Sequence, residues 1–185
     1  MMTVFNKPGR ENTDAALDVL QQGIRHYACK QVVIASTYGD TALKAARLLK
    51  GMAITLVVVT HNVGFKEPGK LEMTAAIRQE LEAQGVKVCT GTMPFRSIGT
   101  AIREKQGYSQ QDLVANTLRL FGQGVKVGVE IALMASDAGL ITPDDVLTVA
   151  GTGRGADTVL LLSPRPSNQL FDVKVRAILA KPATW

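Results

Sequence analysis

Short, wholly apolar runs alternate with amphipathic segments along the first half of the chain. Three such runs, QVVIAS (Gln31–Ser36), AITLVVVT (Ala53–Thr60) and VKVCT (Val86–Thr90), are separated by stretches whose apolar residues recur with helical spacing. Uninterrupted apolar runs of this length are typical of strands that are covered on both faces of a parallel sheet. Because parallel neighbours need a crossover connection, the alternation predicts an α/β fold with helices on both faces.

The last third of the chain predicts a change of strand direction. DVLTVA (Asp145–Ala150) and DTVLLLSP (Asp157–Pro164) read as a fourth and a fifth strand, and VKVRAILAKP (Val173–Pro182) as a possible sixth. The Gly151–Asp157 segment between the fourth and fifth is too short for a crossover, so these two strands should be antiparallel neighbours. We therefore expect a three-layer α/β/α fold with a mixed, mostly parallel sheet whose last strands are antiparallel. No repeat or linker interrupts the chain, which indicates a single domain over residues 1–185.

The helical segments are expected at 12–30, 41–51, 70–85 and 95–141. In the first, Asn12 and Thr13 are capping residues, and Tyr27 falls on the apolar face. The longest should be broken at Gly107 and at Gly122–Gly124. Residues Gly124–Glu130 alternate like a strand, but the apolar pattern continues to Gly139, so a helix is favoured over a strand there.

Charge and composition narrow the class of partner. The chain carries 21 basic and 16 acidic residues, a net charge of +5 that favours anionic partners. The basic residues form no stripe and aromatic residues make up only 5%, so nucleic acid is disfavoured and a phosphorylated small molecule is preferred.

Several other classes are disfavoured by what the sequence contains. Two cysteines, two histidines and no carboxylate cluster argue against a metal site, and we expect both thiols to be reduced. No apolar run is long enough to span a bilayer, and the N-terminal segment lacks the apolar stretch of a signal peptide. We expect a cytoplasmic protein.

The most informative loop is STYGDTA (Ser36–Ala42), which follows the first predicted strand. In parallel sheets, ligands bind where loops converge beyond the carboxyl ends of the strands. Here Gly39 permits a tight turn, and a helix beginning near Asp40 points its unpaired N–H groups at the strand end, beside the hydroxyls of Ser36, Thr37 and Thr41. This arrangement predicts an anion site; the alternative is that Thr37 or Asp40 only caps the helix.

The loop GTGRGADT (Gly151–Thr158) follows the fourth predicted strand. Gly151, Gly153 and Ala156 match the dinucleotide-binding pattern G-x-G-x-x-A, but that pattern must open a helix after the first strand of the unit, and this loop leads into another strand. One interpretation is a backbone path close to a ligand, with Arg154 contacting an anion. The other is a hairpin turn in which Asp157 accepts hydrogen bonds from backbone N–H groups.

Few residues of the sequence are candidates for catalysis. His61 follows the second predicted strand and is either an acid–base residue or a structural one, and Asn62 either contacts a ligand or supports the turn. No serine or cysteine has the context of a nucleophile. Glu130 and Asp137 could serve as acid–base groups or as ordinary helix charges, and Arg78, Arg103 and Arg119 are expected on solvated helix faces.

The motifs in these loops resemble those of the pyruvate kinase C-terminal (alpha/beta) domain-like family, especially its small stand-alone members in archaea and bacteria. The resemblance rests on the Ser-Thr-x-Gly-x-Thr-Ala loop at Ser36–Ala42 and on the Gly-Arg-Gly-Ala-Asp-Thr run at Gly153–Thr158, and it extends over nearly the whole chain. In pyruvate kinases the first of these loops holds a phosphate of a sugar effector. Here the loop carries no cation, which argues against a sugar bisphosphate and leaves a single phosphate, held by N–H groups and hydroxyls, as a reasonable ligand. Pyruvate kinase activity itself is not expected, because that active site belongs to a separate barrel domain.

For the stand-alone group the resemblance implies a flavin mononucleotide (FMN) type of ligand. Because the C-terminal domains of pyruvate kinases pack into oligomers, the resemblance also implies a homo-oligomer. The phosphate would lie on the Ser36–Thr41 loop, and the ring would extend past Thr60–Asn62 toward Gly151–Asp157. The residues expected to contact the cofactor are Ser36, Thr37, Tyr38, Gly39, Asp40, Thr41, Thr60, His61, Asn62, Gly151, Thr152, Gly153, Arg154, Gly155, Ala156, Asp157 and Thr158.

Three functional hypotheses follow from these observations. The first is binding of a phosphorylated small molecule, with FMN as the leading candidate. The second is an enzyme, either a flavin-dependent oxidoreductase or a hydrolase of phosphorylated metabolites, with His61 as the candidate catalytic residue. The third is an oligomeric interaction subunit whose loops bind no ligand.

Overall fold

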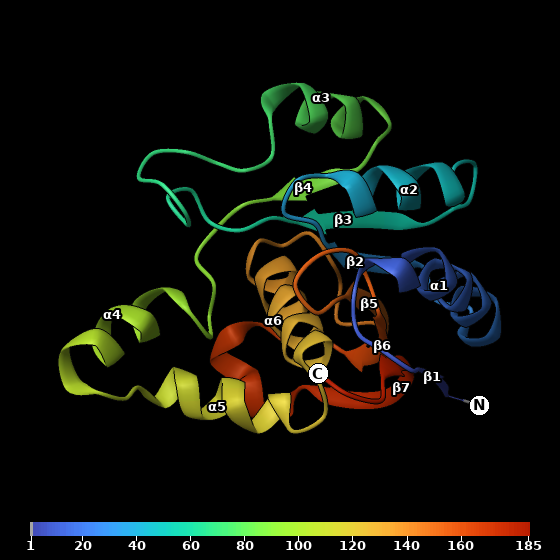
Figure 1. The fold of residues 1–185 in the computed structure, drawn as a ribbon. Helices are drawn as coiled ribbons and strands as arrows, with labels where there is room; N and C mark the ends of the chain where they lie inside the picture. The colour runs from blue at the N-terminus through green and yellow to red at the C-terminus, as the bar shows by residue number, and fades with distance from the viewer. Residues whose placement is uncertain (1) are drawn as a thin grey trace.

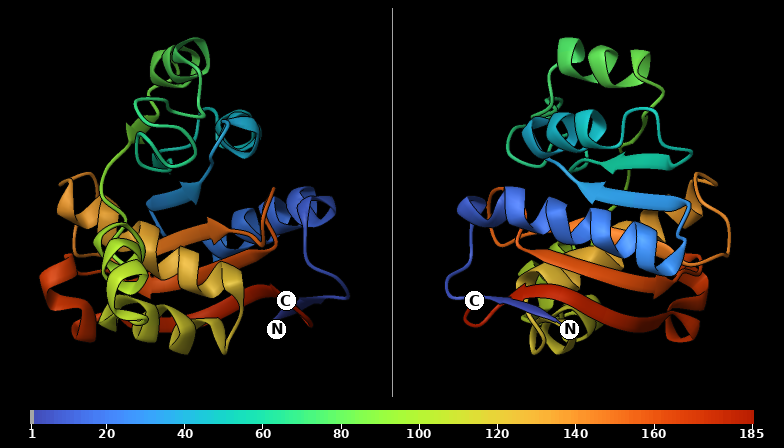
Figure 2. Two further views of the ribbon diagram at one scale, coloured as in Figure 1. Left: turned by 60° about the vertical axis from the view of Figure 1, so that its left-hand side comes forward. Right: turned by 90° about the vertical axis from the view of Figure 1, so that its right-hand side faces the viewer.

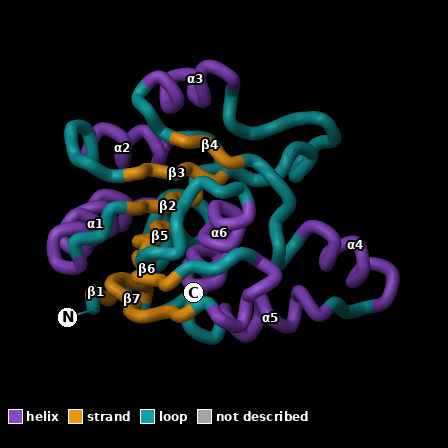
Figure 3. The backbone as a smooth tube through the Cα atoms, turned by 180° about the vertical axis from the view of Figure 1, so that it is seen from behind, coloured by secondary structure: helices purple, strands orange, loops and turns teal. Residues whose placement is uncertain are grey.

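The fold was determined as a computed structural model that describes residues 2–185. One seven-stranded sheet with the strand order β1-β7-β6-β5-β2-β3-β4 forms its centre (Figure 3). The strands are β1 (Thr3–Phe5), β2 (Gln31–Ala35), β3 (Thr55–Val59), β4 (Lys87–Cys89), β5 (Val146–Ala150), β6 (Thr158–Ser163) and β7 (Lys174–Pro182). The helices are α1 (Thr13–Tyr27), α2 (Asp40–Leu48), α3 (Ala75–Ala83), α4 (Ser97–Gln106), α5 (Gln110–Arg119) and α6 (Gln123–Asp137), with short 3₁₀ helices at Arg10–Asn12 and Ser167–Asp172.

The pairing of the strands confirms the predicted mixed sheet. Strands β5, β2, β3 and β4 are parallel, β6 is antiparallel to both β5 and β7, and β1 pairs with β7 in parallel. The hairpin between β5 and β6 was expected from its short loop. The possible sixth strand predicted at Val173–Pro182 corresponds to β7. Strand β1 was not predicted, because a run of only three residues gives almost no alternation.

Two helical layers cover the sheet (Figures 1 and 2). One apolar core packs α1, α2 and α3 against one face, and a second core packs α6 against the other, with α5 packed on α6. Figure 2 shows α1 and α6 on opposite sides of the strands. The α/β/α architecture predicted from the sequence is therefore confirmed.

Three details of the helices differ from the predictions. The Asn12 side chain donates to the carbonyls of Lys7 and Gly9 instead of capping α1, and Tyr27 is exposed at the end of that helix. Helix α3 begins only at Ala75, where Thr74 Oγ1 accepts a hydrogen bond from Ile77 N at 3.3 Å.

Residues Gly124–Glu130 are helical and lie within α6, as favoured. Helices α4 and α5 project from the body of the molecule as an arm beside α6 (Figure 1). None of the helices in residues 2–185 combines the length and the hydropathy needed to cross a membrane.

Candidate functional site

Two adjoining cavities lie at the carboxyl ends of β2, β3 and β5. The strand order places β2 and β5 side by side, while the chain proceeds from β2 in one direction toward β4 and returns to β5 on the other side. This reversal of direction is where open α/β sheets bind their ligands. We call the cavity of about 590 Å³ the larger cavity and the one of about 250 Å³ the smaller cavity. Both are lined by Ala35, Ser36, Thr37, His61, Arg96, Gln123 and Val127.

The larger cavity is bounded by the ends of β2 and β3, by α6 and by the α4–α5 arm. Four cationic side chains and two carboxylates line it: Arg96, Arg103, Arg119, Lys126, Asp112 and Glu130. Two of the cations have carboxylate partners, since Arg103 Nη1 lies 3.0 Å from Asp112 Oδ1 and Lys126 forms an ion pair with Glu130. In the described part of the chain, Arg96 and Arg119 form no ion pair.

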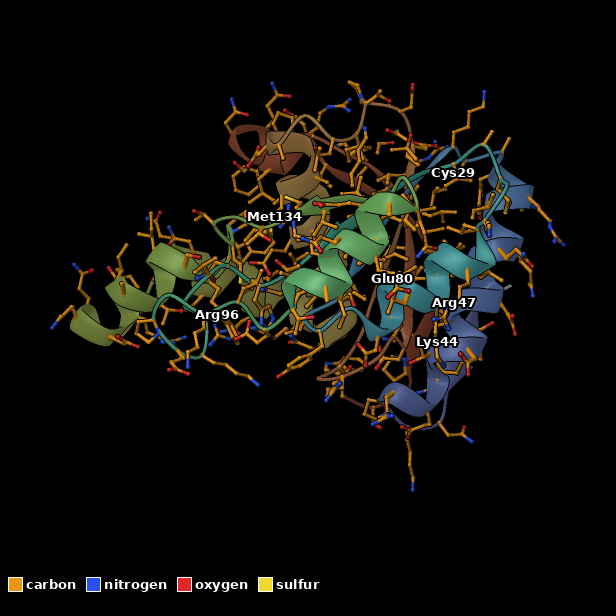
Figure 4. All side chains as sticks on the ribbon, turned by 90° about the horizontal axis from the view of Figure 1, so that it is seen from above. Cys29, Lys44, Arg47, Glu80, Arg96 and Met134 are labelled. Atoms are coloured by element: carbon orange, nitrogen blue, oxygen red, sulfur yellow. The ribbon has the colours of Figure 1, made fainter. Side chains whose placement is uncertain are left out.

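Arg119 and Arg96 are held in place by neutral partners. Arg119 Nε donates to Gln123 Oε1 at 2.7 Å and its Nη1 donates to Asn116 Oδ1 at 2.8 Å. The Arg96 guanidinium lies 4.3 Å from the centroid of the Phe65 ring. Amide oxygens and an aromatic face orient a guanidinium without neutralising its charge, so both remain available to an anion. In Figure 4, Arg96 lies on the side of the molecule where α4 projects, away from Cys29.

The Lys126–Glu130 pair is the most deeply buried pair of charges in the site. The two side chains are 4% and 2% exposed and stand one turn apart on α6. Glu130 Oε2 accepts from Lys126 Nζ, and Glu130 Oε1 accepts from Phe95 N at 2.8 Å. Burial lowers the pKa of Lys126, the Glu130 carboxylate opposes this effect, and the charges of Arg119 and Arg96 add to the lowering.

The smaller cavity contains most of the predicted phosphate loop. Ser36, Thr37, Tyr38, Asp40 and Thr41 line it, and Ala42 N donates to Ser36 Oγ at 3.3 Å. Gly39 is the residue before α2 and has a φ of +97°, where an added Cβ would lie 2.3 Å from Ile77 Cγ2. The glycine is thus required both by the turn and by the packing of α3.

Arg154 lies in the smaller cavity but is already paired. Its Nη2 lies 3.1 Å from Asp40 Oδ2, and its guanidinium lies 4.6 Å from the centroid of the Tyr38 ring. Both charged groups are more than half exposed, so the pair is weak and a ligand can replace it.

Some residues of the Gly151–Thr158 loop line the smaller cavity, and the others are buried in the protein or serve the fold. Gly151, Gly153, Arg154 and Gly155 line the smaller cavity. A Cβ on Gly151 would lie 2.5 Å from Gly155 O, and one on Gly155 would lie 2.5 Å from Arg10 Cα, so these glycines allow the loop to pack closely on itself and on the N-terminal segment.

The rest of this loop is structural. The buried Asp157 carboxylate accepts hydrogen bonds from Gly9 N at 3.0 Å, Thr152 N at 3.1 Å and Thr158 Oγ1 at 2.8 Å. Ala156 belongs to the core beneath α1. Four residues of the loop lie outside both cavities: Thr152, Ala156, Asp157 and Thr158.

His61 lines both cavities and stacks on Phe65, with ring centroids 3.7 Å apart. Its Nδ1 is buried and has no hydrogen-bond partner within residues 2–185. Burial lowers the pKa of His61, and the nearby Arg96 adds to this effect, while Glu72 and Glu130 oppose it. A neutral imidazole with an unused nitrogen can accept or donate a proton at the cavity wall.

Thr60 and Asn62 flank His61 and have different surroundings. Thr60 lines the larger cavity, and its Oγ1 lies 2.7 Å from Thr90 Oγ1. Asn62 Nδ2 donates to Val63 O at 2.9 Å, which supports the turn, and the residue lies outside both cavities.

Sequence reasoning missed the cationic side of the larger cavity. Arg103 is exposed, as expected, and also lines this cavity, whereas Arg119 is half-buried in its wall. Arg96 and Lys126 were not identified. One signal was available, because Lys126 and Glu130 stand four residues apart in a helix that is otherwise almost entirely apolar. Of the two carboxylates noted on α6, Asp137 is exposed and accepts a hydrogen bond from Ser167 N.

The two cysteines lie outside both cavities. Cys29 and Cys89 are unpaired and buried, and burial raises the pKa of each thiol. Within residues 2–185, no group of three or more His, Cys, Asp or Glu side chains is arranged to hold a metal ion. A scan of the chain against models of known protein families finds no match.

Proposed function

We propose that the protein binds a phosphorylated small molecule in the two adjoining cavities, with FMN as the first candidate. One observation carries the proposal: two guanidinium groups, those of Arg96 and Arg119, are oriented by neutral partners in a cavity of about 590 Å³. Pockets for small molecules typically measure about 300–1,000 Å³, so the size also suits such a ligand.

The loop before α2 supports binding of a phosphate group. The first turn of α2 directs its N–H groups toward the end of β2, and the hydroxyls of Ser36, Thr37 and Thr41 lie beside them. Backbone N–H groups at a helix start together with hydroxyl donors are a common setting for phosphate. Arg96 lines both cavities and would bring a full positive charge to the same anion. The choice of FMN comes from the resemblance of the two loops to the stand-alone pyruvate kinase C-terminal domain-like proteins.

The first experiment compares FMN with riboflavin, which differs only by lacking the phosphate. Native mass spectrometry and the visible absorption spectrum of freshly purified protein would identify a flavin that co-purifies. Titration of flavin-free protein should give a much lower Kd for FMN than for riboflavin. Equal affinities would contradict phosphate recognition, and absence of binding of either flavin would contradict FMN as the ligand. A different phosphorylated molecule in the native mass spectrum would support the phosphate site and identify another ligand in place of FMN.

A threonine substitution tests the loop directly. Thr37 lines both cavities, so Thr37→Val should remove a hydroxyl donor while keeping the shape of the side chain. Loss of a hydrogen bond to a charged group costs about 1.5–3 kcal/mol, or roughly a 10- to 150-fold rise in the Kd for FMN. Isothermal titration calorimetry gives this value.

The matched control is Thr92→Val, at an exposed threonine outside both cavities, which should leave the Kd unchanged. The same Kd in both variants would contradict the assignment of the loop. Substitution of Gly39 is less informative, because a side chain there would collide with Ile77 and disturb the fold.

A further inference from the structure

A buried amine and a buried carboxylate line the larger cavity together with the two guanidinium groups that have no carboxylate partner among the described residues. Lys126 and Glu130 are almost inaccessible to bulk solvent, yet both belong to the cavity wall. Lys126 Nζ donates to Glu130 Oε2 and lies 5.6 Å from the centroid of the Phe95 ring. Arg96 and Arg119 line the same cavity.

Stability alone is a weak explanation for such a pair. Removing two charges from water costs several kcal/mol each, and apolar residues of similar volume usually serve a core equally well. The rest of α6 is packed with valine, alanine, leucine and isoleucine. Charges retained at the wall of a cavity are better explained by what the cavity binds.

We propose that Lys126 is the nucleophilic amine of a carbonyl-binding site in the larger cavity, and that its substrate is a small 2-oxo acid. Arg119 and Arg96 hold the carboxylate of the oxo acid, as planar guanidinium groups do in many carboxylate sites. Glu130 accepts and returns the proton that the amine must lose and the intermediate must gain.

The reaction at Lys126 is the formation of an imine. The uncharged amine attacks the carbonyl carbon to give a carbinolamine, and a C=N bond then replaces the C=O bond. The carbonyl oxygen leaves as water with two protons, which come from the amine nitrogen and pass in part through Glu130. No electrons are exchanged with an outside partner, so the step needs no oxidant or reductant.

The surroundings of Lys126 favour its reactive form. Burial lowers the pKa of the Lys126 amine, Arg119 and Arg96 add to the lowering, and Glu130 opposes it. Desolvation and neighbouring cations are two established ways of activating a lysine for attack on a carbonyl group. Glu130 cannot rotate freely, because Phe95 N holds its other oxygen.

The test is reductive trapping on the full-length protein. Incubation with 2-oxobutyrate and sodium borohydride should convert the imine to a stable secondary amine, in which hydride from the borohydride adds to the former carbonyl carbon. Peptide mapping by mass spectrometry should place the adduct on Lys126, in preference to the exposed lysines. The neutral analogue 2-butanone, in which a methyl group replaces the carboxylate, should give little adduct at Lys126.

Three variants separate chemistry from structure. Lys126→Arg keeps a cation beside Glu130 but removes the nucleophile, so the adduct at position 126 should disappear. Arg119→Gln should raise the 2-oxobutyrate concentration needed for half-maximal labelling by about tenfold or more, since a hydrogen bond to a charged group is lost. Lys44→Arg, at an exposed lysine paired with Asp14, is the control and should leave the labelling of Lys126 unchanged.

Labelling spread over the exposed lysines without preference for Lys126 would overturn the proposal, as would equal labelling by 2-butanone. Mapping on the unaltered protein decides this even where Lys126→Arg fails to fold. The carbonyl site and the proposed phosphate site both use Arg96 and Arg119, so flavin affinity is measured on separate samples without an oxo acid. FMN binding without an adduct at Lys126 would support the proposed function and contradict the carbonyl site. An adduct at Lys126 without FMN binding would support the carbonyl site and contradict FMN as the ligand.

Discussion

His61 is the residue whose surroundings and ionisation are most closely linked. Its ring stacks on Phe65 and its Nδ1 is buried without a partner among the described residues. Burial lowers the pKa of His61 below its ordinary value of about 6.5, so the unfolded chain binds a proton at a higher pH than the folded chain does. The free energy of unfolding should therefore decrease as the pH falls through about 6.5 toward the lower pKa of the folded state. Urea unfolding between neutral and mildly acidic pH, for the unaltered protein and for His61→Gln, measures this contribution.

An NMR titration provides the direct check on His61. The imidazole signal that disappears in His61→Gln should titrate with a midpoint below the ordinary value of histidine. A midpoint at or above that value would contradict the effect of burial, and so would a pH dependence of stability that is the same in both proteins.

Single residues also show how far the sequence could predict the site. Ser36, Thr37 and Thr41 were identified because a loop that follows an apolar run and opens a helix has a known position at the edge of a parallel sheet. Arg96 and Arg119 could not be found in this way, since their place at the cavity depends on how the α4–α5 arm packs beside α6. Asp157 had two open interpretations, and only the positions of Gly9 and Thr152 distinguish them.

Among the secondary-structure elements, α6 has the closest contact with the sheet. A Cβ on Gly124 would lie 2.1 Å from Thr158 Oγ1 and 2.5 Å from Thr158 Cβ. Thr158 is a branched residue of β6 whose hydroxyl donates to Asp157, so it has little freedom to move. Gly124→Ala should therefore lower the free energy of unfolding by about 1–3 kcal/mol through overpacking. The gain of roughly 0.8–1 kcal/mol that alanine has over glycine applies to a helix interior, and Gly124 is the second residue of α6, so a net loss of stability is expected. Chemical denaturation measures the difference.

The control for α6 is Ser136→Ala, near the end of the same helix. Ser136 is half-buried and its side chain forms no hydrogen bond within residues 2–185, so alanine should leave stability unchanged or slightly higher. A Gly124→Ala variant as stable as Ser136→Ala would mean that α6 can move away from the sheet without cost.

Elements with a long apolar pattern were the ones that the sequence predicted well. Strands β2, β3, β5 and β6 coincide with largely apolar runs, and α6 coincides with the longest apolar helical pattern. Strand β1 was missed because it has only three residues and pairs only with β7, which lies at the other end of the chain. The start of α3 was placed too early because Leu71 and Met73 fit the helical pattern but pack as loop residues against the core under α2.

Across the whole molecule, one sheet joins two cores that face opposite ways. In β2, Val32 and Ile34 belong to the core under α1 and α2, whereas Val33 belongs to the core under α6. The same alternation recurs in β3, β5 and β6, because successive side chains of a strand point to opposite faces. Neither helical layer can separate without exposing strands that the other layer also needs. The chain should consequently unfold as one cooperative unit, as expected for a single domain.

Two leucines test this coupling from opposite faces. Leu20 of α1 is 0% exposed in the first core and Leu133 of α6 is 1% exposed in the second. Leu20→Ala and Leu133→Ala should each lower the free energy of unfolding by about 2–5 kcal/mol, from lost burial and the cavity left behind. In both variants, urea transitions followed by far-UV circular dichroism and by the fluorescence of Trp185 should still coincide. Separate transitions in either variant would mean that the layer carrying the substitution unfolds alone, and that the shared strands do not couple the two cores.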